Sequence, residues 1–206
     1  MVGWKVPVTP IMLLLINVLG DGIPGLHLAR ESSDIRIMDR KPIGRDESFV
    51  NQNLLQVIVR QTTVCSLVVW LAYYLGTFHT FSSAITPSHE MGQSMAFLVL
   101  GWTSILHIFT VRSRKSLFKI PLNENPALTI SALVMIVVFG LLVLIEPVGA
   151  VFGIVPISGY HWISAILISL IPTIIAEMWK LVESYFEEKE HKRRLVRYRR
   201  NSEDRL

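Results

Sequence analysis

A carboxylate and a carboxamide stand inside the first apolar stretch of the chain, in the segment LINVLGDGIPG of residues 15–25. An Asp at the centre of a membrane helix costs about 2.5–3.5 kcal/mol, so such a residue normally faces a cavity or an ion pathway. Asn17 and Asp21 are four residues apart and would project from the same face of an α-helix. Both supply hard oxygen ligands, which suit Ca²⁺, Mg²⁺ or Mn²⁺. The spacing therefore predicts a cation site at Asn17 and Asp21.

The glycines and the proline of this segment add backbone chemistry. Gly20, Gly22, Pro24 and Gly25 weaken the helical ladder and can free carbonyl groups to turn toward a cation. Gly20 is accordingly a third, backbone candidate. Two structural alternatives stay open at this point. Asp21 can be protonated or paired with a polar group on a neighbouring helix, and the glycines can serve only for close helix packing.

The elements that must position these residues are membrane spans. Of the 206 residues 51% are apolar and 17% charged, a balance typical of a membrane protein. A bilayer core of about 30 Å needs about 20 largely apolar residues per helix. We expect an all-α bundle of five transmembrane helices in residues 1–186, followed by a basic cytoplasmic tail in residues 187–206. The five spans lie near Val6 to Ala29, Gln52 to Tyr74 or beyond, Gln93 to Val111, Pro126 to Ile145 and His161 to Trp179.

The distribution of Lys and Arg predicts the orientation, because cytoplasmic loops carry the excess of basic residues. The loops at residues 78–90 and 146–160 contain neither. We therefore expect an external N-terminus, a cytoplasmic C-terminus and earlier helices supplied from elsewhere. The basic residues gather in three segments: Arg30, Arg36, Arg40, Lys41, Arg45 and Arg60; Arg112, Arg114, Lys115 and Lys119; and nine between Lys180 and Arg205.

Other reactive side chains carry weaker signals. His27, His107 and His161 lack metal-ligand spacing, and we interpret them as ordinary residues near helix ends. Glu146 and Glu177 could carry protons, but such acids near span ends are more often satisfied by water or by a basic partner such as Lys180.

The remaining features exclude several classes of protein. The lone Cys65 excludes a disulfide framework and a multi-cysteine metal site, and it is interpreted as apolar filling. A net charge of only +4 without one broad basic face disfavours nucleic acid as a partner. The basic tail could continue the last helix and lie along anionic headgroups, or it could be a solvated topology signal.

Several motifs occur in order along nearly the whole chain. NVLGDGIPGLHL (residues 17–28) is followed by DIRIMDRKP (34–42), VRSRKSLFKI (111–120) and EMWK (177–180). Together they resemble the C-terminal membrane part of type II P-type cation-transporting ATPases, the calcium-pump-like branch. The resemblance implies that the five spans correspond to helices six to ten of that family.

The resemblance also implies roles for individual residues. Asn17 and Asp21 fall on positions where family members coordinate the transported cation, whereas Gly20 occupies a position often held by Thr. The family's eighth helix can carry an acidic ligand for a second ion, but residues 101–104 read GWTS. We therefore expect a single site, for Ca²⁺ or for Mn²⁺ or Mg²⁺, in an integral multi-pass protein that would lie in the plasma membrane if it is bacterial.

The departures from the family pattern limit what this chain can do alone. The phosphorylated D-K-T-G-T motif does not occur in the 206 residues, nor do the nucleotide-binding, phosphorylation and actuator domains. ATP and Mg²⁺ would therefore act only through those missing domains, and we do not expect the chain alone to hydrolyse ATP. Two ligands also fall short of the six to eight oxygens that Ca²⁺ takes.

These departures leave three hypotheses for the chain. It is part of a cation pump, or one piece of a pump split between chains, or an accessory protein that does not transport and packs against an intact pump or another membrane partner. In each, its partners are the lipid bilayer and, for the first two, the rest of a P-type ATPase in cis or in trans.

Overall fold

A computed structural model describes residues 6–31, 52–79, 88–112, 117 and 124–203. Within these residues all regular structure is helical, and five helices are long and apolar enough to cross a membrane. The predicted all-α class with five spans is thereby confirmed. In chain order the elements are α1 (Pro10–Leu15), the π-helix η1 (Ile16–Gly22), α2 (Ile23–Leu28), α3 (Gln52–Phe78), α4 (His89–Val111), α5 (Pro126–Leu144), α6 (Glu146–Ala150) and α7 (Gly159–Glu203).

Three helices begin at side chains that cap free backbone N–H groups. Thr9 accepts from the N–H of Met12 at the start of α1, and Pro10 follows it at the first helical position. Ser88 caps α4, and Asn125 caps α5 by accepting from the backbone N–H three residues on, at 3.1 Å in each case. Because these caps satisfy donors that the helix cannot, they fix where the spans start.

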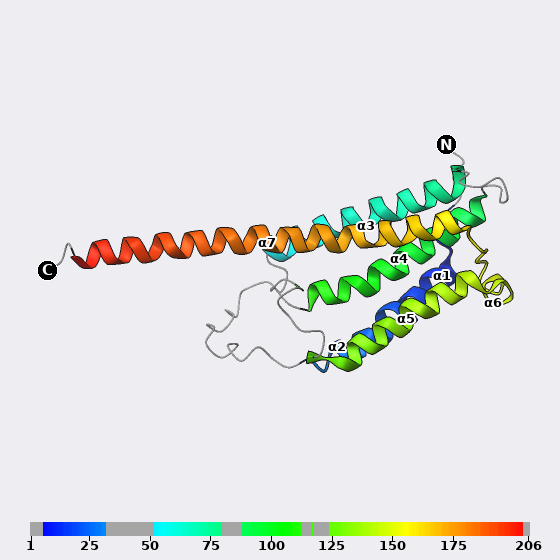
Figure 1. Ribbon diagram of the computed structural model, residues 1–206, viewed down its shortest axis with the longest axis horizontal. Helices are drawn as coiled ribbons and strands as arrows, with labels where there is room; N and C mark the ends of the chain where they lie inside the picture. The colour runs from blue at the N-terminus through cyan, green and yellow to red at the C-terminus, as the bar shows by residue number, and fades with distance from the viewer. Residues whose placement is uncertain (1–5, 32–51, 80–87, 113–116, 118–123, 204–206) are drawn as a thin grey trace.

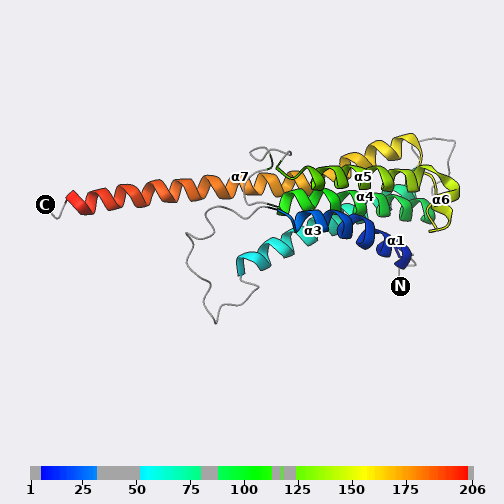
Figure 2. The ribbon, with the colours of Figure 1, turned by 90° about the horizontal axis from the view of Figure 1, so that it is seen from below.

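Helix α4 is the central helix of the bundle. It lies between α3 and α7 on one side and α5 and the first span on the other (Figures 1 and 2). The first span, Pro10–Leu28, consists of α1, η1 and α2. Of the most apolar 18 residues of α4, about 67% are buried, whereas the corresponding share is 22% for the first span and 17% for α3. The outer helices therefore direct most of their apolar surface away from the protein, as expected where lipid is the solvent.

The ring of Phe139 joins the first span, α4 and α5. A Cβ atom on Gly101 of α4 would come within 2.6 Å of this ring, and one on Gly20 of the first span within 3.5 Å. Phe97 packs against the same ring, with 5.2 Å between the centroids. Gly101 therefore allows α4 and α5 to approach closely around an aromatic side chain.

Helix α7 is much longer than the predicted span. It runs for 45 residues, passes Pro172 without ending, and projects far beyond the rest of the bundle (Figure 1). It leaves at the end of the bundle opposite to the start of α1. The helix also continues across residue 186, where the sequence predicted the membrane domain to give way to a tail. The short α6, which Glu146 begins, was not predicted either.

Candidate cation site

The residues predicted to bind a cation lie in the π-helix η1, between α1 and α2. A π-helix closes its hydrogen bonds from residue i to i+5, and such segments are rare and often occur at functional sites. Pro24 lies two residues after the π-helix and has no N–H to donate to the carbonyl of Gly20, which interrupts the regular ladder there. The sequence predicted an α-helical turn at Asn17 and Asp21, so the wider turn is a correction.

Asp21 is exposed on the outer side of this segment, and its carboxylate meets a side chain of α4. The Ser104 hydroxyl donates to Asp21 Oδ1 at 2.5 Å. An ionised carboxylate has about four lone-pair sites, so one hydroxyl leaves most of its accepting capacity open. Asp21 thus has a polar partner on a neighbouring helix, and a serine hydroxyl carries no charge.

Asn17 and Gly20 lie in different surroundings. Asn17 is exposed like Asp21, whereas Gly20 and Ile16 are buried. Gly20 borders the Phe139 ring of α5, so the space of a side chain there is occupied by packing. The structure therefore leaves Asn17 and Asp21 open together, and it turns Gly20 toward the interior of the bundle.

Ser104 is the site residue that sequence reasoning missed. The segment of residues 101–104 contains no carboxylate, but it contains the hydroxyl groups of Thr103 and Ser104, which can also contribute to a polar site. The partner stands 83 residues from Asp21 along the chain, so only the packing of α4 against η1 brings the two together.

The surface around the two open polar residues is apolar and uncovered. Leu14 is 60% exposed, Val18 54% and Leu26 71%. Such apolar side chains suit contact with lipid, but a carboxylate and a carboxamide among them do not. This face of the first span therefore has the composition of a surface that another membrane element covers.

A polar cluster holds the far end of the first span. Arg112 Nε donates to Glu31 at 2.6 Å, and its terminal nitrogen donates to Glu124 at 3.2 Å. The amide of Asn125 donates to both Glu31 and the carbonyl of His27, each at 2.9 Å. The Arg112 side chain is only 3% exposed. This cluster therefore ties the end of α2 to the end of α4 and the start of α5.

The second intramembrane acid, Glu177 on α7, is buried and paired. Lys180 donates to one of its oxygens at 2.8 Å and to the carbonyl of Thr110 at 2.6 Å. The other oxygen accepts the backbone N–H of Leu117 at 2.9 Å. The pairing expected between Glu177 and Lys180 is confirmed, and it joins α7 to the end of α4.

The other predicted residues do not assemble into a second site. His27 lies in the last turn of α2, His107 in α4 and His161 in α7. Throughout the described ranges, no three His, Cys, Asp or Glu side chains come together as metal ligands. Cys65 accepts a hydrogen bond from Gln61. The motif at residues 34–42, together with Arg114 and Lys115, lies outside the described residues.

Comparisons with known proteins match most of this chain. A family model described as "Cation transporting ATPase, C-terminus" matches residues 5–182. Calcium-transporting ATPase 1 of Bacillus cereus is 28% identical over 89% of the chain and 22% of the relative. Calcium-transporting ATPase 1 of Lactococcus lactis is 26% identical over 90% and 20%. Calcium-transporting ATPase 2 of Saccharomyces cerevisiae is 33% identical over 50% and 9%. The chain spans about a fifth of the length of the bacterial relatives.

Proposed function

Because this chain belongs to the family of cation transporting ATPase C-termini, we propose that it works as part of the membrane domain of an ATP-driven cation pump. In that role Asn17 and Asp21 provide part of the site that holds the transported ion. Membership of this family confirms the resemblance drawn from the sequence motifs. The five spans likewise agree with an integral, multi-pass membrane protein.

The observation that carries the proposal is the open carboxylate of Asp21. A helix that exposes an acid in mid-membrane needs a partner for the charge, and a divalent cation supplies one. Asn17 and Asp21 both lie in the π-helix, and both are exposed. Ser104 fixes one carboxylate oxygen and leaves the other free to bind a metal. Gly20 enters only through its backbone.

The number of oxygens determines what else the site needs. Asn17, Asp21 and Ser104 offer four side-chain oxygens, fewer than the six to eight that Ca²⁺ takes. The remaining ligands would come from other helices of the pump, in cis or in trans, packed on the exposed face of the first span. Phosphoryl transfer from ATP with Mg²⁺ would likewise belong to domains not represented in these 206 residues.

Ca²⁺ is the ion we propose, because the relatives reported above are named calcium-transporting ATPases. Mn²⁺ and Mg²⁺ also favour oxygen ligands, and competition between the ions would rank them. The basic loops and tail support a cytoplasmic C-terminus. A reporter fused after Leu206 should then be active in the cytoplasm, and an external signal would contradict this orientation.

Complementation tests the function directly. The full chain would be co-expressed with the Bacillus cereus calcium-transporting ATPase cut back to the part that precedes the matched region, and ATP-driven ⁴⁵Ca²⁺ uptake measured in inverted vesicles. The wild-type chain and the matched control Glu90→Gln, on the exposed first turn of α4, should support uptake.

In the same vesicles Asp21→Asn should reduce uptake at least about tenfold, because the site loses its only charged ligand from this chain. Full uptake by this variant with unchanged Ca²⁺ affinity would contradict the ion-site assignment. If the wild-type chain assembles with the truncated pump and supports no uptake, the accessory protein is the better reading.

A further inference from the structure

Arg60 of α3 is a cation that stacks on an aromatic ring of α7. Its guanidinium lies over the ring of Trp179 on α7, with 4.3 Å between Cζ and the ring centroid. Its Nε is buried without a hydrogen-bond partner, and among the described residues no carboxylate forms an ion pair with it. A guanidinium carries five N–H donors, and its contact with the face of an aromatic ring uses none of them.

Within the apolar stretches Leu54–Phe78 and Gly159–Phe186, this pair lies about one bilayer thickness from the far ends of α3 and α7, which is compatible with a position near a bilayer surface. Nineteen residues lead from Arg60 to the end of α3 at Phe78, about 28 Å of helix. Twenty-one residues lead from the start of α7 at Gly159 to Trp179, about 31 Å. Each distance matches a hydrocarbon core of about 30 Å. Trp is enriched at this depth, where one side of its ring meets lipid and the other meets headgroups.

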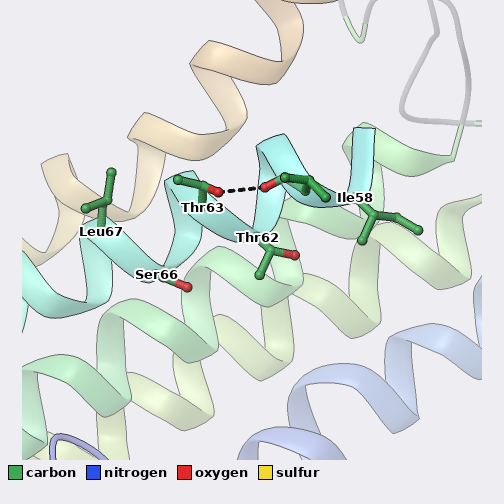
Figure 3. A pocket seen from close by; sticks show the side chains of 6 residues that line it. Ile58, Thr62, Thr63, Ser66 and Leu67 are labelled. Carbon is green, nitrogen blue, oxygen red and sulfur yellow. Dashed lines mark hydrogen bonds between the residues drawn. The ribbon is translucent and has the colours of Figure 1, made fainter. Parts of the chain in front are cut away.

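A hollow on the outer surface of α3 is lined by residues that flank Arg60 along the helix. Figure 3 shows its lining side chains, with the Thr63 hydroxyl turned back onto the carbonyl of Val59 at 2.8 Å. Leu67 is 60% exposed and lies seven residues after Arg60, hence on the same side of the helix. The full lining is Ile58, Val59, Thr62, Thr63, Ser66 and Leu67.

We propose that Arg60, Trp179 and this hollow form a binding site for one anionic phospholipid. The phosphate would accept paired hydrogen bonds from the guanidinium, the geometry that Arg provides for phosphate groups. An acyl chain would lie in the hollow against the apolar side chains of Ile58, Val59 and Leu67. Basic positions between transmembrane helices bind anionic headgroups in this way. The site is separate from the proposed cation site and does not depend on transport.

Native mass spectrometry of the purified full chain in detergent tests this assignment. Dioleoyl phosphatidylglycerol would be titrated in parallel with dioleoyl phosphatidylcholine, which has the same chains and no net charge. We expect Arg60→Gln to weaken phosphatidylglycerol binding about fivefold, the effect of one basic residue at the headgroups, and to leave phosphatidylcholine binding unchanged. Lys189→Gln, an exposed cation further along α7, is the matched control and should bind like wild type.

Equal phosphatidylglycerol binding by wild type and Arg60→Gln would overturn the site, as would an equal loss in Lys189→Gln. Leu67→Trp fills the hollow without touching the cation and should also weaken phosphatidylglycerol binding, so the proposal stays testable if Arg60→Gln does not fold. Unchanged binding by Leu67→Trp would exclude the hollow. Displacement of the lipid by millimolar inorganic phosphate, or a dimer that Leu67→Trp abolishes, would show a different occupant.

Discussion

Asp21 and Glu177 are both carboxylic acids on membrane-spanning helices, but their surroundings differ. Glu177 is 5% exposed, and its oxygens meet the ammonium of Lys180 and the backbone N–H of Leu117. Asp21 is exposed and meets the hydroxyl of Ser104. An acid surrounded by donors and a cation from its own chain stabilises the fold. An exposed acid with few hydrogen-bond partners has carboxylate oxygens available for a ligand. The number of partners therefore fits a structural role for Glu177 and the proposed ligand role for Asp21.

The largest expected effect on stability is at the closed acid. Glu177→Gln removes the charge that balances Lys180, whose side chain is only 15% exposed, and should lower the free energy of unfolding by about 3 kcal/mol, because a largely buried charge without its partner is strongly destabilising. Unfolding by SDS in mixed micelles would measure this change in the free energy of unfolding. The double variant Glu177→Gln with Lys180→Met should recover part of the loss. A loss below about 1 kcal/mol would remove the contrast with Asp21.

A smaller loss is expected at the cluster that anchors the first span. Arg112→Ala should cost about 2 kcal/mol, because Glu31 keeps its bond from Asn125 and Glu124 is half exposed. Arg112→Lys keeps the positive charge and should lose less stability than Arg112→Ala. In the complementation assay Arg112→Ala should weaken Ca²⁺ affinity more than it lowers the maximal rate, because it loosens the helix that carries Asp21. Equal unfolding curves for wild type and Arg112→Ala would show that the anchor is unimportant.

The two glycines that face Phe139 extend the comparison to packing. Gly101→Ala should destabilise the fold by about 1–2 kcal/mol, because its Cβ would come within 2.6 Å of the ring. Gly20→Ala meets the same ring at 3.5 Å, an ordinary contact, and should cost less than about 0.5 kcal/mol. Thermal unfolding of the two variants side by side would measure the difference. The reverse order would mean that the first span packs more tightly than α4.

The smallest expected effect on folding is at the open acid. Asp21→Asn retains an oxygen that can accept from Ser104, and it should change the free energy of unfolding by less than about 1 kcal/mol. The same micelle experiment would measure this beside Glu177→Gln, the identical chemical change at the closed acid. A loss as large as that of Glu177→Gln would make Asp21 a structural residue, contrary to the proposal.

The sequence predicted the spans well because hydropathy and helix length are local properties. Gln52, Val111 and Pro126 are span boundaries that structure and sequence share. The pairing of Glu177 with Lys180 was also predictable, since the two residues are three apart on one helix. The π-helix was not, because its register depends on Pro24 and on how Gly20 packs against Phe139. Ser104 and the partners of Arg112 were missed because they come from distant parts of the chain.

The projection of α7 has a consequence for the reach of the tail. From Trp179 to Glu203 the helix adds 24 residues, about 36 Å, while charges in physiological salt are screened over about 8 Å. A charge near Glu203 is therefore several screening lengths away from Trp179 and interacts only weakly with charges at that level. If Trp179 lies at the headgroups as proposed, α7 holds Glu203 at a fixed distance from the bilayer.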